Sequence, residues 1–414
     1  MRLTGLPLRR FMTAPMAILV INCGSSSVKF ALFHGDDERA RASGMVDRIG
    51  TADVSGSYRV AGGPRQSIAC PAGGDHGAAL DAVLSSLRGE PALAQLEVRA
   101  VGHRVVHGGP NFSAPVRVDD GVLAAIRALA PLAPAHNIPN ALGIEAARRL
   151  FPEVPQVAVF DTAFHQTIEP HVYRYAIPEA LHREHRVRRY GFHGTSHGYV
   201  AGEALRRLAL DPGDSRLITA HLGNGCSATA VLNGRSADTS MGLTPLEGLV
   251  MGTRSGNVDP NLHAYLAREA GLDLDGVTDL LNRKSGLAGL SGISNDMRVL
   301  TDACRRGDEA AALAIDVFCF RLAREIAGLM VALRGAPDAL VFTGGIGENS
   351  PLVRGKTLDH LAGFGFATDP TRNGTGGESS GGVITAEGSR PVALVVPTNE
   401  EFAIARATRA LAAP

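Results

Sequence analysis

The sequence predicts an α/β protein built from two related halves, and three observations carry this prediction. Short apolar strands alternate with amphipathic helical segments along most of the 414 residues. A strand, glycine turn and second strand at AILVINCGSSSVKFALF return about 200 residues later as RLITAHLGNGCSATAVL. Hydrophobic residues make up 45% of the chain and charged residues 20%, enough apolar material for more than one core. A coincidence between two common glycine hairpins is the alternative explanation of the repeat.

The first half begins with two strands, AILVI from Ala17 and VKFALF, separated by the turn NCGSSS. Segments 52–65 and 66–77 are rich in Gly, Pro and polar residues, so we expect strand connections and a loop. Apolar spacing predicts helices over 78–88 and 119–130. VRAVGHRVVHGG predicts a strand that runs into a glycine-rich loop, and PQVAVFDTAFH predicts another strand with polar residues at its end.

The second half begins with the turn-rich HRVRRYGFHGTSH, followed by a helix over 197–208. RLITAHLGNGCSATAVLNGRSAD predicts strand, glycine turn, strand and turn. Residues 308–334 predict a long amphipathic helix that Gly335 and Pro337 stop, and ALVFTGGIGENS predicts a buried strand before a glycine loop. A flexible connection is expected at 373–382, and PVALVVPTNEE predicts a last strand before a closing helix of about ten residues.

The charge balance restricts the partners. Forty-one basic residues match 41 acidic ones, whereas proteins that bind the phosphate backbone of nucleic acids usually carry a basic excess. No apolar run approaches the roughly 20 residues needed to cross a bilayer. The five cysteines form no C-x-x-C pair and are expected to be free thiols in a reducing compartment, so a soluble, cytoplasmic protein is expected. Residues 1–15 lack a signal-peptide pattern and are expected to be a disordered extension or to precede a start at Met16.

Two familiar nucleotide-binding templates do not fit. The chain contains no G-x-x-x-x-G-K-[ST] segment. The glycines at 223 and 225 with Ala228 match the dinucleotide fingerprint, but the β-rich SATAVLNG follows where that fingerprint requires a helix. A Rossmann fold is therefore rejected.

Two histidine pairs have a spacing of four residues, as zinc ligands on a helix can have: His193 with His197, and His103 with His107. H-E-x-x-H is absent, and Gly194 and the glycines after His107 stand where a ligand-bearing helix would run. Metal binding through these histidines is therefore disfavoured.

The glycine turns fit phosphate binding better. A turn without Cβ atoms lets successive backbone N–H groups converge on an anion. In NCGSSSVK the serines add donors and Lys29 adds a positive charge; it is one of only three lysines in the chain. A solvated lysine at a strand edge is the alternative interpretation.

Two arginines in glycine-rich loops suggest recognition of a carboxylate or a phosphate. Arg104 lies in GHRVVHGG and Arg254 in MGTRSGNVDP, and a guanidinium binds both kinds of anion in a bidentate manner. Singly, each could be a structural ion-pair partner. Together with Asp161 and His193 at other loop ends, they form a candidate set for stabilising a transferring anion.

Acidic and amide side chains supply candidates for magnesium. Asn22 precedes the first glycine turn, and Glu400 and Glu401 follow the strand PVALVVPTN. Oxygen ligands near phosphates, completed by water, are typical of Mg²⁺ sites. For one of the two glutamates, a position in the first turn of a helix, where a carboxylate complements the dipole, is an equally good explanation.

Nine segments together closely resemble the acetokinase family of acetate kinases, in the family's order from residue 17 to about 405. The resemblance implies two duplicated ribonuclease-H-like domains with a cleft between them, as in the superfamily of acetate and sugar kinases, heat-shock chaperone ATPases and actin. The implied units are 16–163 plus 402–414, and 164–401. The nine segments are VINCGSSSVKF, GHRVVHGG, VFDTAFH, YGFHGTSH, AHLGNGCS, TPLEGLVMGTRSG, SGISNDMR, VFTGGIGEN and PTNEE.

The resemblance also implies roles for individual residues. Those assigned to catalysis are Asp161, His193 and Arg254, and those assigned to Mg²⁺ are Asn22 and Glu400. Arg104 would hold the substrate carboxylate, and the acyl wall would consist of Val106, Ala135, Phe192 and Pro245. The implied contacts to ATP are Lys29, His221, Leu222, Gly223, Asn224, Gly225, Asp296, Met297, Arg298, Gly345, Ile346, Gly347, Glu348 and Asn349.

Three positions depart from the family pattern. Asn257 replaces a usual Asp, and Ile138 replaces a usual Pro in HNIPN; both lie outside the roles just given and leave local loop geometry open. Ala135 stands where the family often has Leu. The smaller side chain predicts a longer acyl pocket, so propionate is expected to be accepted as well as acetate.

The implied activity is reversible, Mg²⁺-dependent transfer of the ATP γ-phosphoryl group to acetate, with Mn²⁺ able to substitute, by a homodimer. A carboxylate is ionised at neutral pH, so no base is needed to activate it. Asp161 is therefore expected to orient an arginine or metal-bound water, although the family often labels it a proton acceptor. A sugar kinase and a chaperone-like or actin-like ATP-binding module remain as alternatives. The apolar wall disfavours the first, and no peptide-binding segment is expected for the second.

Overall fold

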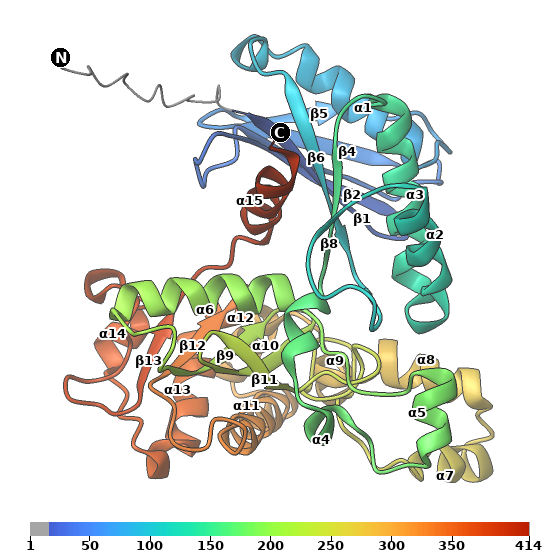
Figure 1. The fold of residues 1–414 in the computed structure, drawn as a ribbon. Coiled ribbons are helices and arrows are strands. Elements are labelled where there is room, and N and C mark those ends of the chain that lie inside the picture. The colour runs from blue at the N-terminus through green and yellow to red at the C-terminus, as the bar shows by residue number, and fades with distance from the viewer. Residues whose placement is uncertain (1–15, 414) are drawn as a thin grey trace, which may run out of the picture.

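The structure is a computed structural model that describes residues 16–413, so the expectation about residues 1–15 lies outside it. Two separate β-sheets form its framework (Figure 1). The first runs in the order β5–β4–β3–β2–β1–β6–β8–β7, and the second in the order β11–β10–β9–β12–β13. The strands are β1 (Ala17–Cys23), β2 (Ser27–His34), β3 (Ala42–Asp47), β4 (Ser55–Val60), β5 (Arg65–Ile68), β6 (Val98–Val105), β7 (Val116–Arg117), β8 (Gln156–Phe160), β9 (Arg216–Leu222), β10 (Cys226–Leu232), β11 (Arg235–Thr239), β12 (Ala339–Thr343) and β13 (Val392–Val395).

The two sheets share one topology. In the first, β1, β2 and β3 pair antiparallel, while β6 runs parallel to β1 and β8 runs parallel to β6. In the second, β9, β10 and β11 pair antiparallel, while β12 runs parallel to β9 and β13 runs parallel to β12. The repeated sequence pattern is therefore the β1–β2 hairpin and its counterpart β9–β10, and the prediction of two related halves is confirmed.

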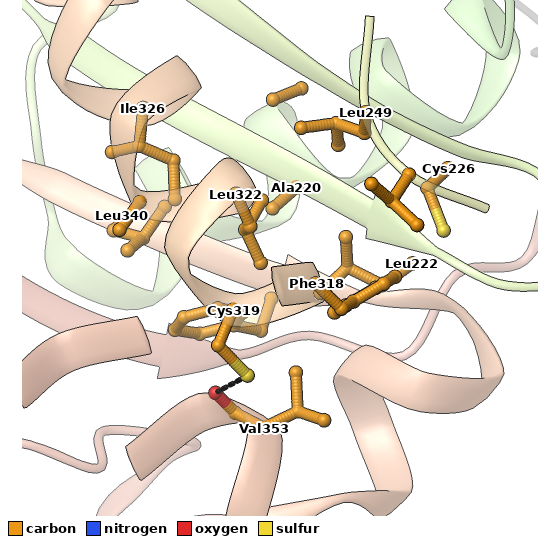
Figure 2. Packing of buried hydrophobic residues seen from close by; sticks show 14 of the residues in the cluster. Ala220, Leu222, Cys226, Leu249, Phe318, Cys319, Leu322, Ile326, Leu340 and Val353 are labelled. Atoms are coloured by element: carbon orange, nitrogen blue, oxygen red, sulfur yellow. Dashed lines mark hydrogen bonds between the residues drawn. The ribbon is translucent and has the colours of Figure 1, made fainter. Parts of the chain in front are cut away.

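Each sheet has one face covered by helices of its own half. Alternate residues of β1 divide between the two faces: Leu19 and Ile21 pack with α1 and α3, whereas Ile18 and Val20 face the other way. In the second sheet, Ala220 and Leu222 pack against α11, whose Cys319 thiol donates to the Val353 carbonyl of α13 (Figure 2). The helices are α1 (His76–Arg88), α2 (Asp120–Ala128), α3 (Pro134–Leu150), α4 (Pro170–Tyr173), α5 (Glu179–His185), α6 (Gly194–Leu208), α7 (Leu262–Glu269), α8 (Leu274–Arg283), α9 (Gly286–Ser291), α10 (Met297–Arg305), α11 (Glu309–Leu329), α12 (Gly344–Asn349), α13 (Pro351–His360), α14 (Pro370–Gly374) and α15 (Glu400–Ala412).

The other faces of the two sheets meet through an exchanged pair of helices (Figure 1). Helix α6 follows β8 of the first sheet but packs on β9 and β12 of the second. Helix α15 follows β13 of the second sheet but packs on β1, β6 and β8 of the first, and the two helices contact each other. One apolar cluster therefore runs from β1 through both helices to β12 and β13. The chain crosses between the sheets twice, after β8 and after β13.

Several local predictions were wrong. Within 52–77 the chain forms strands β4 and β5 rather than connections only. Tyr58 is buried there, and its hydroxyl donates to Gln66 across the hairpin. This packing stabilises strands that the polar composition of the segment did not predict. Helix α3 was not predicted, because Pro139 and the glycine at 143 interrupt its pattern, although both are buried against the core. The glycine at 194 does not prevent a helix, since α6 begins there.

Three predicted ends also differ. Helix α11 stops at Leu329, because the next residues tighten into successive three-residue turns that end at Arg334. The glycine loop after β12 is the short helix α12. The segment 373–382 is not an irregular connection, since it contains a helical turn and the end of α14. Buried Arg354 orders it by donating to the side chain and the carbonyl of Asn373.

Candidate active site

Two neighbouring parallel strands, β6 and β8, bring an arginine and an aspartate together at the end of the first sheet. Arg104 lies on β6, and Asp161 follows β8 directly. Nε and Nη2 of Arg104 donate to both carboxylate oxygens of Asp161 at 2.6–3.1 Å. Burial opposes the charge of Arg104, but the facing carboxylates of Asp161, Glu400 and Glu401 outweigh it and raise the pKa of this arginine. One edge of the guanidinium is thus fixed, and the edge that carries Nη1 is left for a ligand.

A small cavity of ≈ 110 Å³ opens beside this ion pair. It gathers predicted residues from two distant segments: Asn22 and Lys29 of the first hairpin, and Glu400 at the start of α15. Arg104 lines the same cavity. The sequence prediction that these side chains lie together therefore agrees with the geometry, and Glu401 joins them.

The oxygen donors of this cavity fit a divalent cation. The Asn22 amide and the Glu400 carboxylate line this cavity together. Burial raises the pKa of Glu400 to about 7 although Arg104 opposes this, so a cation beside it would favour its charged form. No three side chains of His, Cys, Asp or Glu in the described part of the chain gather as a metal-binding group. Water or substrate oxygens would have to complete the coordination.

The second hairpin, β9–β10, has a tight glycine turn at residues 223–225. Gly223 donates its N–H to the Gly225 carbonyl at 3.0 Å, and the Gly252 N–H donates to the Asn224 carbonyl at 3.0 Å. A Cβ built on Gly225 would lie 3.5 Å from Nη1 of Arg254 and 3.6 Å from Nε2 of His193. The turn, the guanidinium and the imidazole therefore border one small volume.

His193 reaches this volume through an unusual backbone conformation. It has φ +55° and ψ +23° at the N-terminus of α6, a left-handed conformation that costs a non-glycine residue about 1 kcal/mol or more. Burial lowers the pKa of His193 well below its usual value, and the neighbouring His221, His197, Arg104 and Arg254 lower it further. His193 is therefore a neutral imidazole here.

Arg254 is held by its own loop. Its Nη1 donates to the Pro245 carbonyl at 3.2 Å, and burial lowers the pKa of the guanidinium. Asn257 closes this loop, because its side-chain oxygen accepts from the Gly248 N–H at 2.8 Å and its N–H donates to the Gly248 carbonyl. The departure from the family's usual Asp thus leaves an acceptor in place for the turn.

Three of the four predicted acyl-wall residues are packed and one is not. Val106 and Phe192 are buried in one apolar cluster, and Pro245 is half-buried. Ala135 lies exposed in the first turn of α3 and lines none of the cavities described here. Ile138, the other departure on α3, is exposed as well.

A cavity of ≈ 870 Å³ on the second half is large enough for a nucleoside. Eight of the residues predicted to contact ATP line it. They are Gly223, Asn224, Asp296, Met297, Arg298, Gly345, Ile346 and Asn349. The residues that sequence reasoning missed here are Asn295, Thr301, Asp302, Arg305, Ser350, Pro351 and Leu352.

The remaining predicted ATP contacts of the second half lie outside this cavity. Glu348 accepts from the N–H groups of Gly344 and Thr398 at 2.9 and 3.1 Å, so it ties α12 to the second chain crossing. Gly347 and Leu222 are buried. His221 and Gly225 lie nearer to His193, with the His193 and His221 rings stacked at 4.4 Å.

His136 on α3 is a site neighbour that sequence reasoning did not assign. Burial lowers its pKa, and the charges of Arg104 and Arg254 lower it further, while that of Asp161 opposes them. Its position in HNIPN, next to the acyl-wall candidate Ala135, was the available signal.

Comparisons with known proteins identify the family of the chain. The model of the Acetokinase family matches residues 17–406. An acetate kinase of Ectopseudomonas mendocina is 56% identical over 394 residues, which cover 95% of this chain and 98% of that protein. An acetate kinase structure from Porphyromonas gingivalis superposes with a TM-score of 0.88 at 41% identity, over 96% of this chain and 99% of that one.

A propionate kinase structure from Francisella tularensis is equally similar, with a TM-score of 0.88 at 42% identity over 96% of this chain and 100% of that one. The family match and the relatives extend over both sheets and both chain crossings. The chain therefore belongs to the acetokinase family and is a phosphotransferase of the kind that uses a carboxyl group as acceptor.

Proposed function

We propose that the protein transfers the γ-phosphoryl group of ATP to acetate, reversibly and with Mg²⁺, to give acetyl phosphate and ADP. One observation supports this most directly: Arg104, fixed by Asp161 through Nε and Nη2, lines the small cavity with Glu400 and stands two residues before Val106, which is buried with Phe192 in one apolar cluster. A short carboxylate with an apolar tail fits such a place, because its charge and its methyl group meet matching surfaces.

The acceptor needs no proton removed from it. A carboxylate is already ionised at neutral pH, so the main obstacle is its repulsion from the phosphoryl group. Arg104 would neutralise and align the acceptor for in-line attack. Both oxygens of Asp161 are engaged by Arg104, which supports a positioning role for Asp161 rather than that of a general base.

The transferring group would sit at the volume bordered by Gly225, His193 and Arg254. Positive charge from Arg254 and an N–H from neutral His193 would stabilise the equatorial oxygens as charge develops on them. Asn22 and Glu400 would hold Mg²⁺, with Mn²⁺ as a substitute, and the cation would offset the charge of the ATP phosphates. Lys29 would add a second charge on the same side, while the adenosine would occupy the ≈ 870 Å³ cavity.

Propionate is proposed as a second substrate. The structural relative from Francisella tularensis is named a propionate kinase. Ala135 in place of a Leu removes bulk at the start of α3, and one extra methylene changes affinity by only about fourfold. We expect kcat/KM for propionate within about tenfold of that for acetate, because a single methylene is discriminated weakly.

Trapping acyl phosphate as its hydroxamate tests the proposal. Purified protein with ATP, Mg²⁺ and hydroxylamine is expected to give hydroxamate with acetate and, less efficiently, with propionate. Parallel reactions contain glucose, to test a sugar kinase, or no acceptor, to test a slow ATPase. ADP release that depends on glucose, or that is unchanged without any acceptor, would contradict the proposal.

The organisation of the chain belongs to the same proposal. Units 16–163 plus 402–414 and 164–401 are supported by the two sheets, which fall on either side of residue 163. A homodimer is proposed from the family resemblance, and light scattering during size exclusion tests it.

Five free cysteines support a cytoplasmic location. Within residues 16–413, no helix combines the length and apolar character needed to cross a bilayer.

A further inference from the structure

A buried chain of hydrogen bonds leads from the second sheet to the imidazole of His193. Thr219 on β9 contacts Nδ1 of His197 through its hydroxyl at 2.7 Å. Nε2 of His197 lies 2.7 Å from the hydroxyl of Ser227 on β10. The same Ser227 hydroxyl lies 2.8 Å from Nδ1 of His193. Thr219, His197 and Ser227 are completely buried, so water does not compete for these bonds.

The direction of the chain follows from counting protons. Burial and the neighbouring histidines lower the pKa of both His193 and His197 well below the usual value, so each ring carries one N–H and one bare nitrogen. Each hydroxyl has a single proton to donate. Among residues 16–413, the Thr219 hydroxyl has no hydrogen-bond partner other than Nδ1 of His197. Thr219 therefore donates to that nitrogen, since otherwise its buried proton would be unsatisfied, at a cost of about 1–3 kcal/mol.

The first assignment determines the others. With Nδ1 of His197 accepting, the proton of that ring is on Nε2 and is donated to Ser227. The Ser227 hydroxyl must then place its own proton on Nδ1 of His193, because the described residues offer it no other acceptor. His193 is left with its proton on Nε2. This nitrogen faces the Gly225 turn and Arg254.

We propose that Thr219, His197 and Ser227 are positioning residues that fix His193 as the Nε2–H tautomer, so that it presents a donor to the transferring phosphoryl group. The assignment of the tautomer stands on the hydrogen bonds and on the neutrality of the two buried rings, whereas its consequence for catalysis rests on the proposed function. With the opposite tautomer, a bare nitrogen would face the phosphoryl oxygens and repel them.

The tautomer can be measured in the resting protein without any substrate. In protein labelled with ¹⁵N-histidine, couplings between ring nitrogens and carbon-bound protons identify which nitrogen carries the proton. The His193 and His197 signals are assigned by their loss in His193→Gln and His197→Gln. Protonated Nε2 in both rings is expected, and a protonated Nδ1 of His193 in the wild type would overturn the proposal.

Variants separate positioning from simple stability. Thr219→Val keeps the shape of the side chain but removes the hydroxyl, whereas Thr219→Ser keeps the hydroxyl. Thr229→Val is the matched control: Thr229 pairs with Thr219 across β9 and β10 and is completely buried as well, but its hydroxyl is bonded to Thr239 and is not part of the chain to His193. Ser227→Ala removes the last link.

In Ser227→Ala, the Nε2–H signal of His193 is expected to be lost. The kcat of this variant should fall about ten- to a hundredfold, which is less than removal of the His193 donor itself would cost, and both KM values should stay within about twofold of wild type. Thr219→Val is expected to show the same changes more weakly, and Thr219→Ser to restore them. Thr219→Val that matches Thr229→Val in both spectrum and kcat would overturn the proposal. A wild-type protein that makes no acyl hydroxamate would remove the proposed function, while its spectrum would still decide the tautomer.

Discussion

The two hairpins that repeat in the sequence have the same backbone and opposite chemistry. In β1–β2 the paired residues near the turn are Asn22 and Lys29. The Lys29 ammonium and the Glu400 carboxylate line the same small cavity there. In β9–β10 the corresponding pair is His221 and Ser227, both engaged in a neutral network. The second hairpin obtains its positive charge from Arg254 of a separate loop. A duplicated scaffold thus supplies two turns of the same backbone, and their side chains make one charged and the other neutral.

Removal of the Arg254 charge is expected to have the largest effect on kcat. Arg254→Ala leaves the second hairpin without a cation, and kcat should fall by about two to four orders of magnitude, the scale of an arginine finger or oxyanion donor. The control is Arg283→Ala, at an exposed position of α8. Near wild-type turnover in a folded Arg254→Ala protein would show that the neutral hairpin needs no cation.

Neutral buried histidines also serve the fold of the first half, and this predicts a pH dependence. Burial lowers the pKa of His103 to about 4, and its ring is bonded to the Gln156 oxygen at 2.7 Å. His103 therefore stays neutral in the folded protein at pH values where the unfolded chain, with a histidine pKa near 6.5, binds a proton. Stability is retained above pH 6.5 and lost as the pH falls towards 4, by about 3 kcal/mol for this one residue.

Denaturant unfolding at pH 7 and pH 4.5 measures this loss. His103→Gln is expected to reduce the difference between the two pH values, whereas His185→Gln, at an exposed position, should leave it unchanged. An equal difference in wild type and His103→Gln would mean that this ring contributes nothing to acid sensitivity.

The small cavity lined by Asn22, Arg104 and Glu400 provides a third test, of the proposed Mg²⁺ site. Glu400→Ala should raise the Mg²⁺ concentration needed for half-maximal activity and lower kcat by about one to two orders of magnitude. Glu309→Ala, at an exposed position in the first turn of α11, measures what a first-turn carboxylate contributes to a helix. If Glu400→Ala and Glu309→Ala differ from wild type only in thermal stability, and by the same amount, Glu400 serves its helix and not a metal.

The smallest expected effect concerns acyl length. Ala135→Leu should lower the propionate-to-acetate ratio of kcat/KM by about fourfold, the value of one methylene. Ile138→Ala, an exposed position on the same helix, is the control. An unchanged ratio would mean that position 135, which is exposed in the structure, does not line the pocket.

Sequence reasoning predicted the repeated strands and the residues at their ends, because short apolar runs and glycine turns are local signals. It did not predict α3, in which Pro139 breaks the local pattern while tertiary packing preserves the helix. The order around Asn373 depends on Arg354, which lies 19 residues away and shows no periodicity. The Arg104–Asp161 pair was foreseen in kind, but its two-point geometry depends on two strands that meet only in the sheet.

The exchanged helices have a consequence for synthesis of the protein. The ribosome releases β1, β6 and β8 early, yet the helix that covers one of their faces begins only at Glu400. Until then, Ile18 and Val20 have no helix of their own half to cover them. The nascent first half is therefore expected to be a client for chaperones, and its maturation should wait for the last helix, however quickly its own strands pair.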